Sequence, residues 1–192
     1  MKIVAAILAA GASTRFGRLK QLFVLPDGRT LIRHAAEAAC ASRAERVAVV
    51  VGSSAERLSE ALSGLALDTV RSPAPNEGIA ASVRAATAWA HEHEAEGLVL
   101  CVGDQPLLTT SHLDALISNL EQEGGLVASY YDGRAGVPAA FPASSFKALS
   151  ELSGDEGAAK ILRATRNLTL IAWPEGGFDI DTPADASRLR AG

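Results

Sequence analysis

A glycine-rich segment near the N-terminus carries two cations at a spacing that suits phosphate. It reads LAAGASTRFGRLK (8–20) and begins at the end of an apolar run. Gly11 and Gly17 give a flexible backbone whose N–H groups can face a phosphate, and Arg15 and Lys20 add positive charge. The glycine spacing matches neither the Walker A pattern nor the dinucleotide-binding pattern. The segment therefore predicts a phosphate-binding loop of another kind, with an ordinary solvated loop as the alternative.

Carboxylates mark two further segments. Asp104 comes directly after GLVLCVG (97–103), and Asp179 and Asp181 alternate across Ile180. A carboxylate at the end of a buried strand is costly to bury unpaired, and it suits a hard divalent cation that bridges phosphates. In a strand, the alternation would place the two later carboxylates on one face. Taken alone, Asp104 is explained equally well as a turn or helix-capping aspartate.

A third candidate segment is PNEGIAASV (75–83), which joins a loop to a helical pattern. Asn76, Gly78 and Ser82 are small polar groups that either contact a base or ribose or cap the helix. Capping is the simpler interpretation of these residues alone.

The elements that must position these residues alternate between strands and helices. Strands are expected at 2–8, 46–52, 68–72 and 97–103, and helices at 30–42, 54–62, 79–93 and 110–122. This alternation predicts an α/β protein with a mostly parallel sheet, whose continuous apolar strands are covered on both faces. The segment GLVASYYDGRAGVPAAF (125–141) predicts a hairpin that turns at Asp132 and Gly133 and adds a small antiparallel element. Ligands of such sheets bind beyond the carboxyl ends of the strands, where all three candidate segments fall.

Composition narrows the class of protein further. The 192 residues are expected to form a single domain, 1–192, and the net charge of −4 argues against broad nucleic-acid binding. Cys40 and Cys101 lie in apolar runs and are expected to be buried thiols, with a disulfide left open. No C-x-x-C occurs, which argues against a structural zinc site. The first apolar run is too short to span a bilayer and its cations follow it, so we expect a cytoplasmic chain without membrane contact.

Five motifs in order resemble one family of enzymes. The pattern L-A-A-G-x-S-x-R-x-G-x-x-K (8–20) is similar to the signature loop of nucleotidyltransferases that act on nucleoside triphosphates. GDQP (103–106), GVP (136–138), GDEGAAK (154–160) and DIDTPAD (179–185) resemble the MobA-like molybdenum cofactor branch. That branch includes molybdopterin cytidylyltransferase and molybdenum cofactor guanylyltransferase. The resemblance covers nearly the whole chain.

The resemblance implies a Rossmann-like three-layer sandwich that transfers a nucleoside monophosphate to an acceptor phosphate, releases pyrophosphate and requires Mg²⁺. It assigns catalysis to Arg15, Lys20 and Asp104, and metal binding to Asp104 and Asp181. Asp179 is either a further ligand or a residue behind the ligands. The nucleotide-binding residues that it implies are Leu8, Ala9, Ala10, Gly11, Ser13, Arg15, Lys20, Asn76, Gly78, Ser82 and Asp104.

The base of the nucleotide and the identity of the acceptor are predicted from two smaller features of the sequence. Alanine before Gly11 resembles the cytidylyl branch, whereas guanylyl relatives tend to have glycine there, so a methyl group at Ala10 would narrow the pocket toward the pyrimidine of CTP. The closing motifs favour molybdopterin as the acceptor. The alternatives are a GTP-using guanylyltransferase, a sugar-phosphate nucleotidyltransferase and a non-catalytic nucleotide-binding chaperone of a molybdoenzyme. A molybdoenzyme or its chaperone is the expected protein partner.

Overall fold

The computed structural model describes residues 1–11, 19–74, 77–178 and 180. Within them, the strands are β1 (Ile3–Leu8), β2 (Val47–Val51), β3 (Asp68–Arg71), β4 (Gly97–Val102), β5 (Val127–Tyr131), β6 (Arg134–Pro142) and β7 (Thr169–Ala172). They form a seven-stranded sheet in the order β3-β2-β1-β4-β6-β5-β7. Strand β6 runs antiparallel to both of its neighbours, and the other pairs are parallel. The predicted strands and the mostly parallel sheet are confirmed.

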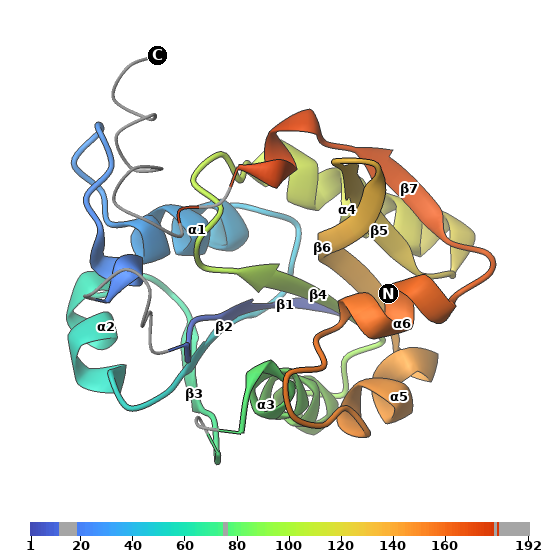
Figure 1. The fold of residues 1–192 in the computed structure, drawn as a ribbon, viewed down its shortest axis with the longest axis horizontal. Helices are drawn as coiled ribbons and strands as arrows, with labels where there is room; N and C mark the ends of the chain where they lie inside the picture. The colour runs from blue at the N-terminus through green and yellow to red at the C-terminus, as the bar shows by residue number, and fades with distance from the viewer. Residues whose placement is uncertain (12–18, 75–76, 179, 181–192) are drawn as a thin grey trace.

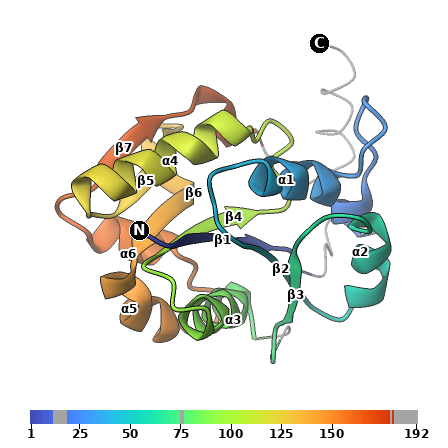
Figure 2. The same ribbon diagram turned by 180° about the vertical axis from the view of Figure 1, so that it is seen from behind.

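Helices cover both faces of this sheet (Figures 1 and 2). The α-helices are α1 (Leu31–Cys40), α2 (Ala55–Ala61), α3 (Ile79–Glu92), α4 (Thr110–Glu123), α5 (Phe146–Ser150) and α6 (Ala159–Ala164). Short 3₁₀ turns lie at η2 (Lys20–Leu22), η3 (Ala143–Ser145) and η4 (Pro174–Gly177). One core cluster joins the sheet to α1, α2 and α4, and a second joins it to α3, α5 and α6. The result is the expected Rossmann-like three-layer sandwich.

The first strand shows how the sequence produces these two cores. Ile3, Ala5 and Ile7 belong to one cluster, whereas Val4 and Ala6 belong to the other. Successive side chains of a strand point to opposite faces, so a strand that is covered on both sides must be apolar throughout. Burial of both faces holds β1 rigidly, and its carboxyl end carries the glycine-rich segment.

The hairpin between β5 and β6 turns where the sequence predicts it. Asp132 and Gly133 both have positive φ, at 50° and 73°. A two-residue hairpin loop of this kind matches the twist of the strands, and Asp-Gly is among its preferred sequences. The turn reverses the chain so that β6 inserts between β4 and β5.

The two cysteines are free thiols. Cys101 is buried in β4, and burial raises the pKa of its thiol to about 12. Cys40 is only partly buried, so the expected burial holds in full for Cys101 alone. In the part of the chain that the structure covers, no helix is long and apolar enough to cross a membrane.

A buried polar network joins α4 to the hairpin. The ring of His112 stacks on Trp173 at 4.6 Å between centroids, and its Nε2 lies 2.7 Å from Ser129 Oγ. Ser129 donates its hydrogen to the carbonyl of Pro138 at 2.6 Å, so the histidine nitrogen must donate to the serine. Burial lowers the pKa of His112 to about 4.

Stability should consequently depend on pH through His112. Between its folded pKa of about 4 and the ordinary value of 6.5, the unfolded chain binds more protons, so stability is full above pH 6.5 and falls as the pH drops toward 4. The full loss is about 3 kcal/mol. Urea unfolding at several pH values should show a shallower slope for His112→Gln than for the wild type. His34, whose pKa burial also lowers, supplies a residual slope.

The exposed His91 offers a matched control for that measurement. His91→Gln should retain the wild-type dependence of unfolding free energy on pH. Equal slopes for His112→Gln and the wild type would contradict the assignment.

Candidate functional site

The candidate site lies at the carboxyl edge of the parallel strands. Strands β1 to β4 run parallel, so the segments that follow them meet at one edge of the sheet. Ala9 N–H donates to the carbonyl of Val50 at 2.9 Å, and Gly103 N–H donates to the carbonyl of Leu8 at 3.2 Å. These bonds fix the beginning of the glycine-rich segment between its two neighbouring strands.

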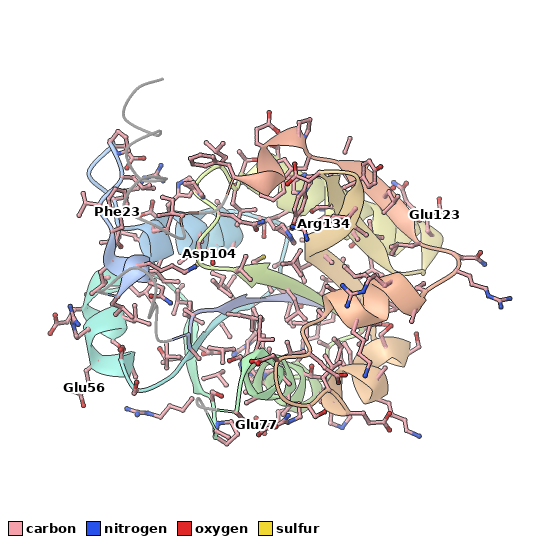
Figure 3. The ribbon with its side chains drawn as sticks, in the orientation of Figure 1. Phe23, Glu56, Glu77, Asp104, Glu123 and Arg134 are labelled. Atoms are coloured by element: carbon pink, nitrogen blue, oxygen red, sulfur yellow. The ribbon has the colours of Figure 1, made fainter. Side chains whose placement is uncertain are left out.

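Lys20 and Asp104 form an ion pair at this edge. The Lys20 Nζ lies 2.6 Å from Asp104 Oδ2, although the residues are 84 positions apart in the chain. Their side chains are 16% and 22% exposed, so the pair is shielded yet reachable from solvent. The structure brings together the two residues that the sequence analysis assigned to phosphate and metal (Figure 3 labels Asp104).

The second oxygen of Asp104 differs from the first. Its Oδ1 is buried and has no hydrogen-bond partner among the residues that the structure describes. An unpaired buried carboxylate oxygen is unfavourable, and a cation or a strong donor relieves the cost. Among residues 1–11, 19–74, 77–178 and 180, no group of three His, Cys, Asp or Glu side chains is placed to hold a metal. Mg²⁺ needs only one or two carboxylates because it retains several waters, so this oxygen fits such an ion.

The backbone around Asp104 is tightly held. A Cβ on Gly103 would lie 2.9 Å from Ile32 Cδ1, so a larger residue there would press on α1. The carbonyl of Asp104 accepts a hydrogen bond from Ile180 N–H at 3.1 Å. Ile180 is itself buried in a small cluster with Phe23 and two leucines.

Gln21 is a site residue that the sequence analysis missed. Its side chain is 3% exposed, and Nε2 donates to the carbonyls of Gly11 at 3.2 Å and Ala9 at 3.4 Å. The amide thus fastens the start of the glycine-rich segment to the residue next to Lys20. The one feature of the sequence that could have pointed to Gln21 is its position directly after Lys20. A single glutamine forms no pattern that predicts a role in a site.

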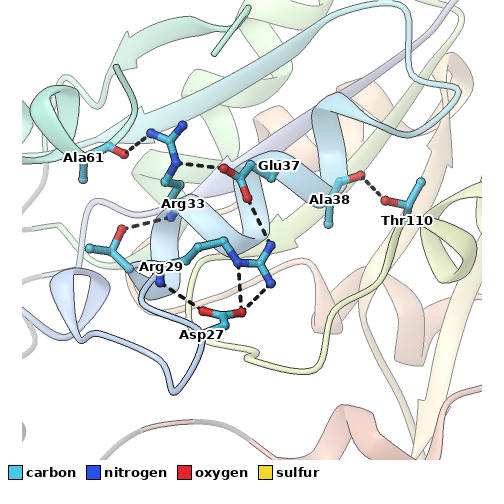
Figure 4. A network of polar contacts seen from close by, with 8 residues as sticks. Asp27, Arg29, Arg33, Glu37, Ala38, Ala61 and Thr110 are labelled. Carbon is cyan, nitrogen blue, oxygen red and sulfur yellow. Dashed lines mark hydrogen bonds and ion pairs between the residues drawn. The ribbon is translucent and has the colours of Figure 1, made fainter. Parts of the chain in front are cut away.

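A charged network braces the hairpin that follows η2 (Figure 4). Arg29 bonds Asp27 at 2.6 Å and Glu37 at 3.0 Å, and Arg33 bonds Glu37 at 2.8 Å and the Ala61 carbonyl at 3.0 Å. Hydrogen bonding from Arg29 lowers the pKa of the Glu37 carboxyl. Exposed ion pairs contribute little to stability because water screens them, so we assign the network to bracing rather than to catalysis.

Gly78, in the third candidate segment, packs against the GDEGAAK loop. Gly78 has φ of 106°, and a Cβ there would lie 2.5 Å from both Asp155 Oδ1 and the carbonyl of Gly154. Only glycine fits this position. Ser82 lies inside the first turn of α3 and is 5% exposed, so it does not cap the helix.

Five of the expected site residues lie outside the described residues: Ser13, Arg15, Asn76, Asp179 and Asp181. Their assignments remain predictions. Of the others, Leu8 to Gly11 lie at the end of β1, and Ala10 is partly buried there.

Comparisons with known proteins identify the family of the chain. The model of the MobA-like NTP transferase domain matches residues 5–169. The purine catabolism protein PucB of Bacillus subtilis is 30% identical over 98% of this chain and 96% of its own. The bifunctional protein GlmU of Staphylococcus saprophyticus is 34% identical, over 61% of this chain but only 26% of its own.

Among solved structures, the manganese complex of Rv0371c from Mycobacterium tuberculosis is similar, with a TM-score of 0.81 and 29% identity. That match covers 98% of both chains. The fold, the full-length relative and the matched family model lead to one conclusion. The chain belongs to the MobA-like NTP transferase family, whose reaction is nucleotidyl transfer from a nucleoside triphosphate.

Proposed function

We propose that residues 1–192 form one nucleotidyltransferase domain that transfers CMP from CTP to the phosphate of molybdopterin, with Mg²⁺ as the cofactor. The observation that carries the proposal is the Lys20–Asp104 pair beyond the end of β4, with Asp104 Oδ1 buried and without a partner in the described part of the chain. The manganese complex of Rv0371c supports a divalent ion at a site of this fold. The molybdopterin assignment rests on the resemblance of the closing motifs.

Lys20 and Asp104 can each exchange the other for a new partner when the triphosphate binds with its metal ion. Lys20 Nζ neutralises Asp104 in the present structure. A metal–triphosphate complex offers a cation to the carboxylate and anionic oxygens to the ammonium, so both charges keep a partner. When bound, Mg²⁺ supplies charge neutralisation across the phosphates. Lysine suits this role because its ammonium is a compact point charge on a flexible stem.

The chemistry needs positioning and charge neutralisation more than a covalent catalyst. An oxygen of the acceptor phosphate attacks the α-phosphorus of the triphosphate in line. A new P–O bond forms, and the bond from the α-phosphorus to the bridging oxygen breaks with its electron pair on the leaving pyrophosphate. Lys20, together with Arg15 as the resemblance implies, offsets the charge on that leaving group. The attacking oxygen is already ionised, so no general base is required.

The choice of CTP rests on Ala10. Its backbone follows Ala9, whose N–H is bonded to Val50, so the methyl group of Ala10 is carried on a fixed edge. A methyl group at that edge narrows the space for a base and favours the smaller pyrimidine. A difference of one methyl group in a pocket discriminates by about tenfold or somewhat more.

An assay matrix of triphosphates and acceptors tests the proposal. Pyrophosphate release should be fastest with CTP plus molybdopterin, and kcat/KM for CTP should exceed that for GTP and ATP by about tenfold or more. Ala10→Gly should reduce this preference without abolishing turnover, because it removes one methyl group from a site that keeps Lys20 and Asp104.

The same matrix distinguishes the alternatives. Clear preference for GTP would identify a guanylyltransferase in place of a cytidylyltransferase. Turnover with sugar phosphates but not with molybdopterin would identify a sugar-phosphate nucleotidyltransferase. Triphosphate binding without pyrophosphate release for any pair would identify a non-catalytic chaperone and overturn the proposal.

A further inference from the structure

Gln105 makes an unusual set of contacts beside the candidate metal carboxylate. It follows Asp104 directly and is 2% exposed. Its Nε2 donates to the carbonyl of Val137 in β6 and to the carbonyl of Gly176 in η4, each at 3.1 Å. One side chain thus joins three segments that are far apart in the chain.

These contacts fix the orientation of the amide. Both partners are carbonyl oxygens, so both N–H groups of Nε2 are used and Oε1 must point the other way. In the part of the chain that the structure describes, Gln105 Oε1 is buried without a hydrogen-bond partner. An unpaired buried acceptor costs free energy, which an apolar side chain of the same length would avoid. Residues that break such a local rule are expected at functional sites.

The frame to which Gln105 is tied is itself rigid. The carbonyl of Val137 also accepts a hydrogen bond from the Tyr131 hydroxyl at 2.9 Å. A Cβ on Gly176 would overlap the rings of Trp173 and Tyr131, so the backbone there is packed against aromatic side chains. The amide therefore ties the loop after β4 to two fixed points.

We propose that Gln105 is a positioning residue that holds Asp104 in the orientation required for metal binding. Two contacts act on the backbone of this short loop: Ile180 N–H donates to the Asp104 carbonyl, and the side-chain amide of Gln105 anchors the residue that follows Asp104. Lys20 pairs with Asp104 Oδ2 in this structure, and Oδ1 is the carboxylate oxygen without a partner among the described residues. The inference rests on the proposed metal role of Asp104.

Binding of Mn²⁺ alone to the full chain tests it without relying on turnover. Gln105→Met keeps the length of the side chain and removes both donors, so it should weaken Mn²⁺ binding by about tenfold or more, as the loss of partners behind metal ligands does elsewhere. Titration calorimetry gives the affinity, and thermal unfolding confirms the fold. Gln105→Leu serves as a second variant if the methionine variant does not fold.

Ser129→Ala is the matched control. Ser129 is also buried and donates to the carbonyl of Pro138, next to Val137, and its side-chain hydrogen bonds within the described residues go to Pro138 and His112 rather than to the loop after β4. The Ser129→Ala variant should be less stable than the wild type and should keep the wild-type affinity for Mn²⁺. Wild-type affinity in a folded Gln105 variant, or equal weakening by Ser129→Ala, would overturn the inference.

Asp104→Ala separates this inference from the proposed function. A wild-type chain that binds Mn²⁺ no better than Asp104→Ala would overturn both the metal role and the positioning role. A wild-type site that depends on Asp104 but is indifferent to Gln105 would overturn the positioning role alone.

Discussion

Asp104→Ala is expected to lower kcat/KM for nucleotidyl transfer by about a thousandfold, or about 4 kcal/mol in transition-state stabilisation, with the fold intact. The substitution removes the carboxylate that follows the central strand β4, whose buried Oδ1 has no partner among residues 1–11, 19–74, 77–178 and 180. The side chain lies at a partly open edge and contributes little to the core, so thermal unfolding should change little. Steady-state rates at several Mg²⁺ concentrations provide the measurement.

Asp104→Asn is the control for that experiment. It keeps the shape of the side chain and removes its charge, so it separates metal binding from packing. Its kcat/KM should fall nearly as far as that of the alanine variant. Turnover by either variant at saturating Mg²⁺ close to the wild-type rate would show that Asp104 is not a metal ligand.

Lys20→Met is expected to lower kcat/KM for the triphosphate by about a hundredfold, the value of one strong charge-assisted contact. The aliphatic stem is retained and the ammonium that faces Asp104 at 2.6 Å is lost. A second effect should go in the opposite direction. Mn²⁺ alone should bind more tightly to this variant, because the metal no longer competes with Lys20 for the carboxylate.

Lys20→Arg tests whether charge alone is sufficient. Arginine keeps the charge but presents a planar fork in place of a point charge, so partial activity is expected. Unchanged kcat/KM in Lys20→Met would contradict the phosphate role. If Lys20→Met bound Mn²⁺ no more tightly than the wild type, the proposed competition between Lys20 and the metal for Asp104 would be contradicted.

Most of the sheet was predictable because its strands are buried on both faces. β1, β2 and β4 are continuous apolar runs, and Asp132-Gly133 marks the hairpin turn. Strand β7 was not predicted; it is a four-residue strand at the edge of the sheet and is paired with β5. A short edge strand of this kind takes its structure from its neighbour rather than from its own pattern.

The site was predictable where one rule of topology applied. Parallel strands end at one edge of the sheet, and the sequence placed the segments of Lys20 and Asp104 at that edge. In the structure Lys20 Nζ lies 2.6 Å from Asp104 Oδ2. Gln21 and Gln105 were not found because each bonds to backbone carbonyls. Any residue supplies a carbonyl, so such contacts depend on tertiary packing and leave no pattern in the sequence.

The fate of the α-phosphate tests the central claim most directly. CTP labelled at the α-phosphorus is incubated with the chain, Mg²⁺ and molybdopterin, and the labelled products are separated. The proposed reaction predicts that the label enters the acceptor product in step with the release of unlabelled pyrophosphate, and that Asp104→Ala abolishes both. Release of inorganic phosphate from the γ-position with no label in any acceptor would contradict nucleotidyl transfer.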